Sequence, residues 1–154
     1  MNFTFAEEQE MLKKMARDFL TDKCPKTMVK QMQESESGYS PELWQEMAGL
    51  GWMGLALPEK YGGTEMSFLD LAVLLEEMGR ACLPGPFIST VVLGALPILE
   101  SGTEEQKQKY LPGISAGKTI FTLALSEMSG SDDAASITTK ATPDKDGYVI
   151  NGTK

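Results

Sequence analysis

The sequence of 154 residues contains no histidine and only two cysteines, Cys24 and Cys82. Without histidine, the usual Ser-His and Cys-His nucleophile systems and most zinc sites are excluded. The two cysteines match no spacing typical of a metal or redox motif, so we interpret them as buried or half-buried thiols in a reducing compartment. The sequence therefore predicts no metal site and no catalytic residue of these kinds.

Positive charge is also scarce. The chain has 14 Lys and Arg residues against 22 Asp and Glu residues, which gives a formal net charge of −8 at pH 7. The basic residues are scattered, and Lys13-Lys14 is the only adjacent pair. Because nucleic-acid binding needs a concentrated positive surface, this composition argues against a nucleic-acid partner. A small basic patch that binds a coenzyme phosphate remains open.

Long apolar runs are absent as well. No run reaches the roughly 18 residues that span a bilayer, so we expect no membrane span. The first eight residues, MNFTFAEE, lack the basic region followed by an apolar region that is typical of a signal peptide. We therefore expect a cytoplasmic location.

The first two-thirds of the chain carries the start signals and apolar spacing of helices. Capping boxes are predicted at residues 4–7 and 103–106, serine caps at Ser40 and Ser67, and a helix start at Pro25. The third helix is expected to end near residues 49–51, and the strongest helix to cover about 68–81. A central helix over 87–99, kinked at Pro97 or packed closely at Gly94, and a short helix that ends at residues 112–113 complete the prediction.

After Gly117 the pattern changes to that of β-structure. Residues 119–125 are rich in β-forming side chains and predict a buried strand, followed by a loop over 129–133. Residues 137–142 and 148–151 predict two strands of a hairpin. A second hairpin turn is predicted at Asn151-Gly152, but only two residues follow it, so we expect a sheet that is cut short.

Several segments, taken in order, resemble the acyl-CoA dehydrogenase family. They are 43–52 (LWQEMAGLGW), 58–63 (PEKYGG), 74–80 (LLEEMGR), 102–112 (GTEEQKQKYLP) and 148–154 (YVINGTK). The resemblance covers essentially the whole chain. It implies a mainly α fold, in which an N-terminal helical-bundle domain of about six helices over 1–117 precedes the first strands of a truncated β-barrel-like middle domain over 118–154.

The segment 123–132 (LALSEMSGSD) resembles the family's flavin-binding segment. The resemblance implies that the backbone at Leu123 and Leu125 and the hydroxyl of Ser126 contact the flavin ring of FAD. It places Gly130 and Ser131 near the flavin pyrophosphate, with Ser131 also near the acyl-CoA substrate. Glycine permits close approach of backbone amides to phosphate, and serine adds a small donor. Two departures stand out, since Met128 replaces the family's usual proline and the loop is one residue shorter.

The intact relative is expected to be an FAD-dependent oxidoreductase that introduces an α,β double bond into an acyl-CoA thioester, as in fatty acid β-oxidation. The resemblance also implies an electron-transfer flavoprotein as the electron acceptor and a homo- or hetero-oligomeric assembly. The family's catalytic carboxylate belongs to a C-terminal domain, so we assign no catalytic residue here and expect this chain alone to be inactive. The alternative is a non-catalytic helical interaction module derived from the same fold.

Two further features have more than one interpretation. The adjacent Glu76 and Glu77 point in different directions on a helix, so we interpret them as solvated or ion-paired residues instead of a catalytic pair. Four apolar residues of the central helix could line an acyl-chain channel, although plain core packing is the simpler interpretation for each. These residues are Phe87, Ile88, Val91 and Val92.

Overall fold

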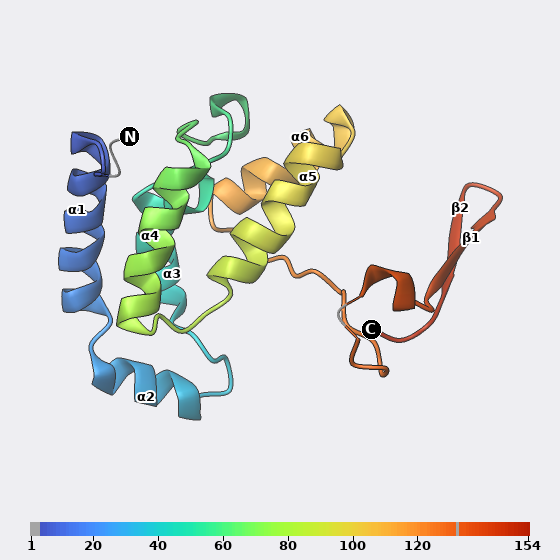
Figure 1. Ribbon diagram of the computed structural model, residues 1–154, viewed down its shortest axis with the longest axis horizontal. Helices are drawn as coiled ribbons and strands as arrows, with labels where there is room; N and C mark the ends of the chain where they lie inside the picture. The colour runs from blue at the N-terminus through green and yellow to red at the C-terminus, as the bar shows by residue number, and fades with distance from the viewer. Residues whose placement is uncertain (1–3, 132) are drawn as a thin grey trace. The chain divides into compact units, whose positions relative to one another are not determined.

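The computed structural model describes residues 4–131 and 133–154. The chain forms two compact units, of which the first extends to Thr122 and the second runs from Leu123 to Lys154. The first unit is helical and the second carries a two-stranded antiparallel sheet (Figure 1). The predicted fold class, a helical N-terminal domain followed by the beginning of a β-domain, is confirmed. The domain boundary after Gly117 stays a prediction, and residues 118–122 pack with the helical unit.

Six α-helices are described in the helical unit, together with two short 3-10 turns and one π-helical segment. The helices are α1 (Glu7–Lys23), α2 (Lys26–Glu34), α3 (Pro41–Gly49), α4 (Phe68–Ala81), α5 (Leu96–Ser101) and α6 (Glu104–Ser115), with the 3-10 turns at Trp52–Gly54 and Glu59–Tyr61 and the π-helix at Ile88–Ala95. Among the described residues, no helix is long and apolar enough to cross a bilayer.

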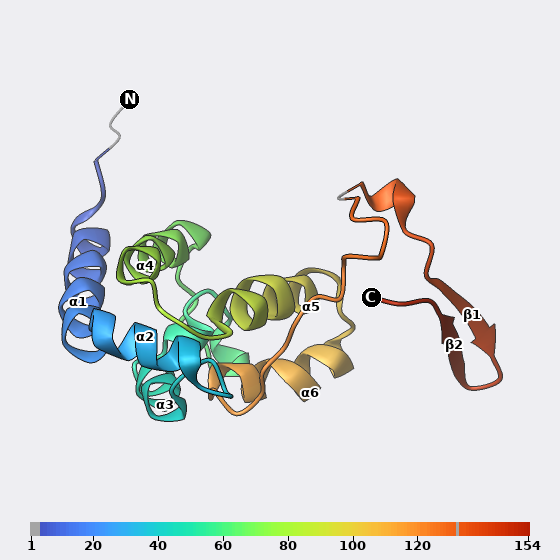
Figure 2. The same ribbon diagram turned by 90° about the horizontal axis from the view of Figure 1, so that it is seen from below.

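Helices α1 and α4 lie side by side and run in the same direction (Figures 1 and 2). The polar contacts between the two helices occur in the same order along both, as expected for helices that run in the same direction. Gln9 donates to Asp70 near the helix starts, and Cys24 lies at Ala81 where both helices end. Helix α2 crosses near these C-terminal ends in both views.

Most helix starts follow the sequence signals. The hydroxyls of Ser40, Ser67 and Thr103 each accept a backbone N–H three residues later, as predicted. The predicted capping box at residues 4–7 is wrong, because Ala6 is the N-cap and the Gln9 side chain accepts its backbone N–H. Pro25 is the N-cap of α2, and Lys26 is the first helical residue.

Helix α6 continues past its predicted stop and includes Pro112 in its interior. Proline lacks the N–H for one helical hydrogen bond, which costs stability. The last turn forms nevertheless because it buries Leu111 and Ile114 completely. Burial therefore outweighs the local effect of proline at this point.

The predicted central helix is divided into the π-helix and α5, with Pro97 in the first turn of α5. The close packing expected at Gly94 is confirmed. A Cβ on Gly94 would lie 2.6 Å from the Cβ of Phe121, so only glycine allows this approach. Phe87 and Val91 are buried in the core, whereas Ile88 is exposed.

The main core lies between α1, α3, α4 and the turn at Trp52–Gly54. Its fully or nearly fully buried side chains include Ala16, Leu20, Trp44, Met47, Trp52, Met53, Leu71 and Leu74. A smaller core beside α6 contains Leu57, Tyr61, Ala95, Leu111 and Ile114. The apolar stripes predicted for the helices therefore face a common interior.

In the second unit, β1 (Lys140–Asp144) pairs with β2 (Gly147–Asn151) as an antiparallel hairpin. The predicted hairpin is confirmed, although Pro143 belongs to β1 opposite Tyr148 and the turn consists only of Lys145 and Asp146.

The predicted buried strand over 119–125 is wrong, because these residues form no ladder with any described strand. Both backbone groups of Phe121 bond to the hydroxyl of Thr90, at 3.2 Å each. A strand needs a neighbouring strand to satisfy its backbone. Here one side chain of the π-helix satisfies those groups at Phe121, and Leu123 and Leu125 remain about half exposed.

Candidate cofactor site

All five residues predicted to bind the cofactor lie in one irregular segment at the start of the second unit. Leu123, Leu125, Ser126, Gly130 and Ser131 are each exposed to solvent. The neighbouring Asp132, part of the predicted loop, lies outside the described residues.

A carboxylate that the sequence did not single out, Glu127, organises this segment. Its Oε2 accepts the backbone N–H of Thr138 at 2.8 Å and the Thr138 hydroxyl at 2.5 Å. Its Oε1 accepts the backbone N–H of Thr139 at 2.9 Å and lies 3.1 Å from the ammonium of Lys154. Lys154 also donates to the carbonyl of Leu125 at 3.0 Å. We call this set of contacts the Glu127 clamp.

The clamp keeps Glu127 ionised. Hydrogen bonds from Thr138 and then Thr139 hold the pKa of this carboxyl group well below its usual range. A carboxylate with its oxygens occupied in this way is a poor proton acceptor, so we assign Glu127 a positioning role and not a catalytic one. Sequence reasoning missed it because its partners are 11 to 27 residues away and lie in no local motif.

The predicted flavin contacts differ in their freedom to bind a ligand. The Leu125 N–H is engaged with the carbonyl of Leu123 at 3.1 Å, and the Leu125 carbonyl is engaged with Lys154. By contrast, the exposed Ser126 hydroxyl has no hydrogen bond to any described residue. Ser126 is therefore the residue of this group that is most available to a ligand.

The loop that follows has the geometry expected of a glycine-dependent turn. Gly130 has φ +66, and a Cβ added there would meet no atom of the described part of the chain within 4 Å. The Ser131 hydroxyl accepts the N–H of Asp133 at 3.2 Å, which leaves its own hydrogen free to be donated. Ser126, Gly130 and Ser131 thus supply two exposed hydroxyl groups and a glycine turn within one segment, which are groups able to bind a phosphate-containing cofactor. Met128, which stands where the resembled family usually has proline, is 92% exposed.

The pair Glu76 and Glu77 forms no catalytic dyad. Glu77 is fully buried and binds both Arg17 and Arg80, whereas Glu76 pairs with Lys13 at the surface. The interpretation of these residues as ion-paired is confirmed. Among residues 4–131 and 133–154, no group of three or more Cys, Asp and Glu side chains is arranged to hold a metal ion.

Comparisons with known proteins agree with this architecture. A model of the acyl-CoA dehydrogenase N-terminal domain matches residues 6–118. The probable acyl-CoA dehydrogenase YngJ of Bacillus subtilis is 35% identical, in a match that covers 100% of this chain and 40% of that protein. Subunit CarC of the caffeyl-CoA reductase-Etf complex of Acetobacterium woodii is 32% identical over 97% of this chain and 40% of its own length.

Among solved structures, an acyl-CoA dehydrogenase from Bacillus anthracis complexed with FAD superimposes with a TM-score of 0.83. It is 33% identical, and the match covers 96% of this chain and 26% of that one. The chain spans about two fifths of the length of the curated relatives named above. Because the family model matches residues 6–118, which is well over half of the chain, the chain belongs to the acyl-CoA dehydrogenase family.

Proposed function

We propose that this chain is the N-terminal part of an FAD-dependent acyl-CoA dehydrogenase that introduces an α,β double bond into an acyl-CoA thioester. The observation that carries the proposal is the segment 123–131, which the Glu127 clamp orders while the Ser126 hydroxyl stays exposed and has no hydrogen-bond partner among the described residues. The solved relative from Bacillus anthracis is a complex with FAD, which supports the choice of cofactor.

In this proposal the flavin supplies the hydride-accepting chemistry for the β-carbon of the substrate. Ser126 donates a hydrogen bond to the flavin ring, beside the backbone of Leu123 and Leu125. Gly130 and Ser131 hold the pyrophosphate, and Ser131 also contacts the acyl-CoA. We assign no residue of this chain to removal of the α-proton, and we therefore propose that the chain alone has no dehydrogenase activity. A role in fatty acid β-oxidation, a cytoplasmic location and an oligomeric state of the intact protein belong to the same proposal.

The FAD proposal predicts that substitutions at Ser126 and at Glu127 weaken FAD binding for different reasons. In a protein extended by the coding sequence downstream of codon 154, Ser126→Ala should perturb the flavin absorption band and weaken FAD binding by about tenfold, the equivalent of one hydrogen bond to a ligand. Glu127→Gln should weaken FAD binding by more than tenfold, because two backbone N–H groups and Lys154 lose a charged partner.

The control is Glu105→Gln, which removes an exposed carboxylate that has no ion pair among the described residues. Its FAD affinity should equal that of the unaltered protein. The 154-residue chain alone should bind FAD weakly or not at all. If the extended protein bound no FAD, or if codon 154 were followed by a genuine stop with a separately encoded partner nearby, the helical interaction module would be the better description.

We further propose that an electron-transfer flavoprotein docks on an apolar groove of the helical unit. The groove has a volume of about 350 Å³, and its lining includes Met11 and Met15 of α1 and the nearby Leu50. These three side chains are 65%, 46% and 44% exposed. Methionine-rich apolar surfaces adapt well to a partner. The relative CarC is a subunit of a complex with Etf, which supports this choice of occupant.

Charge introduced into this groove should block docking. We expect the double variant M11E/M15E to weaken binding of the electron-transfer flavoprotein by at least about tenfold in surface plasmon resonance, because a carboxylate would have to be desolvated in the interface. The control Q31E/Q33E adds the same charge to the exposed surface of α2 and should bind normally. Equal weakening in both variants would indicate a general charge effect and exclude the groove as the docking site.

A further inference from the structure

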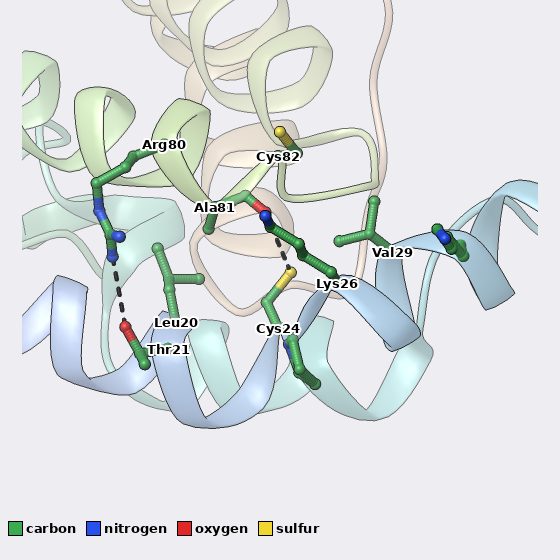
Figure 3. Close-up of a pocket in the computed structure, with 10 residues that line it drawn as sticks. Leu20, Thr21, Cys24, Lys26, Val29, Arg80, Ala81 and Cys82 are labelled. Carbon is green, nitrogen blue, oxygen red and sulfur yellow. Dashed lines mark hydrogen bonds between the residues drawn. The ribbon is translucent and has the colours of Figure 1, made fainter.

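A second pocket, separate from the apolar groove, lies where the ends of α1 and α4 meet the start of α2 (Figure 3). Its volume is about 410 Å³. In Figure 3, Leu20 and Cys24 come from the α1 side, Lys26 and Val29 from α2, and Arg80, Ala81 and Cys82 from the end of α4. We call it the α1–α2–α4 pocket. All of its lining residues belong to the helical unit, so its shape does not depend on the second unit.

The rim of this pocket is positively charged in a chain of net charge −8. Lys26, Lys30 and Arg80 line the pocket, and no acidic side chain does. Arg80 forms an ion pair with Glu77, in which Arg80 Nε lies 2.8 Å from Glu77 Oε2. Lys26 and Lys30 have no ion pair with any described residue. The uncompensated charge is therefore that of the two lysines.

These two lysines are four residues apart on α2 and consequently neighbours on one face of the helix. Like charges at this spacing destabilise a helix slightly, and an anion bound between them would remove this cost. Helix α2 also begins without a capping side chain and has no acidic residue in its first turn. The start of the helix and the two lysines that line the pocket thus each favour a negative charge.

Part of the pocket lining is apolar. Pro25, Val29 and Ala81 are at least partly exposed and contribute hydrocarbon surface beside the charged rim. Two polar groups near this surface are already engaged, since Cys24 Sγ donates to the Ala81 carbonyl at 3.9 Å and Arg80 donates to the Thr21 hydroxyl at 3.4 Å. The Cys82 thiol is exposed, so the expectation of a buried or half-buried thiol is wrong at this position. A ligand that was only an ion would leave this apolar surface exposed to water.

We propose that the α1–α2–α4 pocket binds a small amphipathic anion. A carboxylate or phosphate head group lies between Lys26 and Lys30, and the aliphatic part covers Pro25, Val29 and Ala81. This ligand site is independent of the flavin segment and of the groove at Met11 and Met15.

The test compares four probes on the full chain by isothermal titration calorimetry, with ¹⁵N-detected shifts of Val29 and Ala81 to locate binding. Hexanoate and hexyl phosphate carry the two candidate head groups, hexanol lacks the charge, and inorganic phosphate lacks the tail. We expect saturable binding of at least one amphipathic anion, at least about fivefold tighter than that of hexanol or inorganic phosphate. Which of the two anions binds more tightly identifies the head group.

The double variant K26Q/K30Q should weaken this binding by at least about fivefold, whereas K14Q/K118Q, which removes two exposed lysines outside the pocket, should not. Unchanged thermal midpoints in both variants would show that the fold is intact. The proposal is overturned if no amphipathic anion binds, if hexanol or inorganic phosphate binds equally well, or if both double variants weaken binding alike. None of these outcomes depends on FAD, so they leave the proposed function untouched.

Discussion

Replacement of Gly63 by alanine is expected to destabilise the helical unit by about 3 kcal/mol or more, which is at the upper end of the cost of overpacking. An added Cβ would lie 1.9 Å from the carbonyl oxygen of Leu57 and 2.6 Å from that of Gly54. Both neighbours are backbone atoms, so no side chain can rotate away to relieve the clash. Urea denaturation of the chain, followed by far-UV circular dichroism, would measure the loss as a lower midpoint at unchanged slope.

The matched control is Gly79→Ala, because Gly79 lies inside α4 and an added Cβ would meet nothing within 4 Å. Alanine favours a helix over glycine by about 1 kcal/mol, so this variant should be slightly more stable than the unaltered chain. The two substitutions add the same methyl group and are expected to have opposite effects. If Gly63→Ala were as stable as the unaltered chain, the close approach of the turn to Leu57 would be refuted.

Gly63 also shows what the sequence can and cannot reveal. The segment 58–63 was recognisable as a family segment, but the reason for its final glycine is a contact with Leu57 and Gly54 that only the folded turn creates. Helix starts were easier to predict, because Ser40, Ser67 and Thr103 act on amides three residues away. A capping signal whose partners lie within one helical turn can therefore be recognised in the sequence.

The wrong predictions concern places where residues distant in the sequence determine the structure. Pro112 lies inside a helix because burial of Leu111 and Ile114 outweighs the lost hydrogen bond. Residues 119–125 form no ladder with any described strand, and at Phe121 the hydroxyl of Thr90, about 30 residues earlier, bonds to both backbone groups instead. In both places a contact with distant residues overrides the local pattern.

The candidate cofactor site likewise contains residues that a local sequence segment indicates and one residue whose role depends on distant partners. Ser126, Gly130 and Ser131 were predicted from one contiguous segment, and their binding role stays a prediction. Glu127 was overlooked although it lies inside that segment, because its function depends on Thr138, Thr139 and Lys154. A side chain that holds a site in place leaves no local signature when its partners come from the following hairpin.

The ion pair network at Glu77 gives the second large expected effect. Glu77 is fully buried, and its two oxygens accept Arg17 at 2.6 and 3.0 Å and Arg80 at 2.8 Å. Glu77→Gln keeps the size of the side chain but leaves both guanidinium groups without their shared charge. Because both arginines are partly exposed, we expect a loss on the order of 2–4 kcal/mol in the free energy of unfolding at pH 7.

The same network makes a pH prediction. Hydrogen bonds from Arg17, opposed by burial and aided by Arg80, lower the pKa of Glu77 to about 2 in the folded chain. The pKa of glutamate in an unfolded chain is about 4.3. A lowered folded-state pKa contributes stability that is fully present above the unfolded value and is lost as the pH falls through the folded value. The difference in stability between the unaltered chain and Glu77→Gln should therefore be constant near neutral pH and shrink between about pH 4 and pH 2.

Glu76→Gln is the control for this prediction, since it removes the adjacent carboxylate, which is 58% exposed and pairs with Lys13. An exposed pair of this kind contributes less than about 1 kcal/mol and weakens in high salt. The effect of Glu77→Gln should persist in 0.5 M NaCl, because screening acts only weakly on a buried carboxylate. Equal losses in the two variants, or a Glu77 effect that disappeared in salt, would show that Glu77 is solvated and that the contact between α1 and α4 is held by its apolar residues alone.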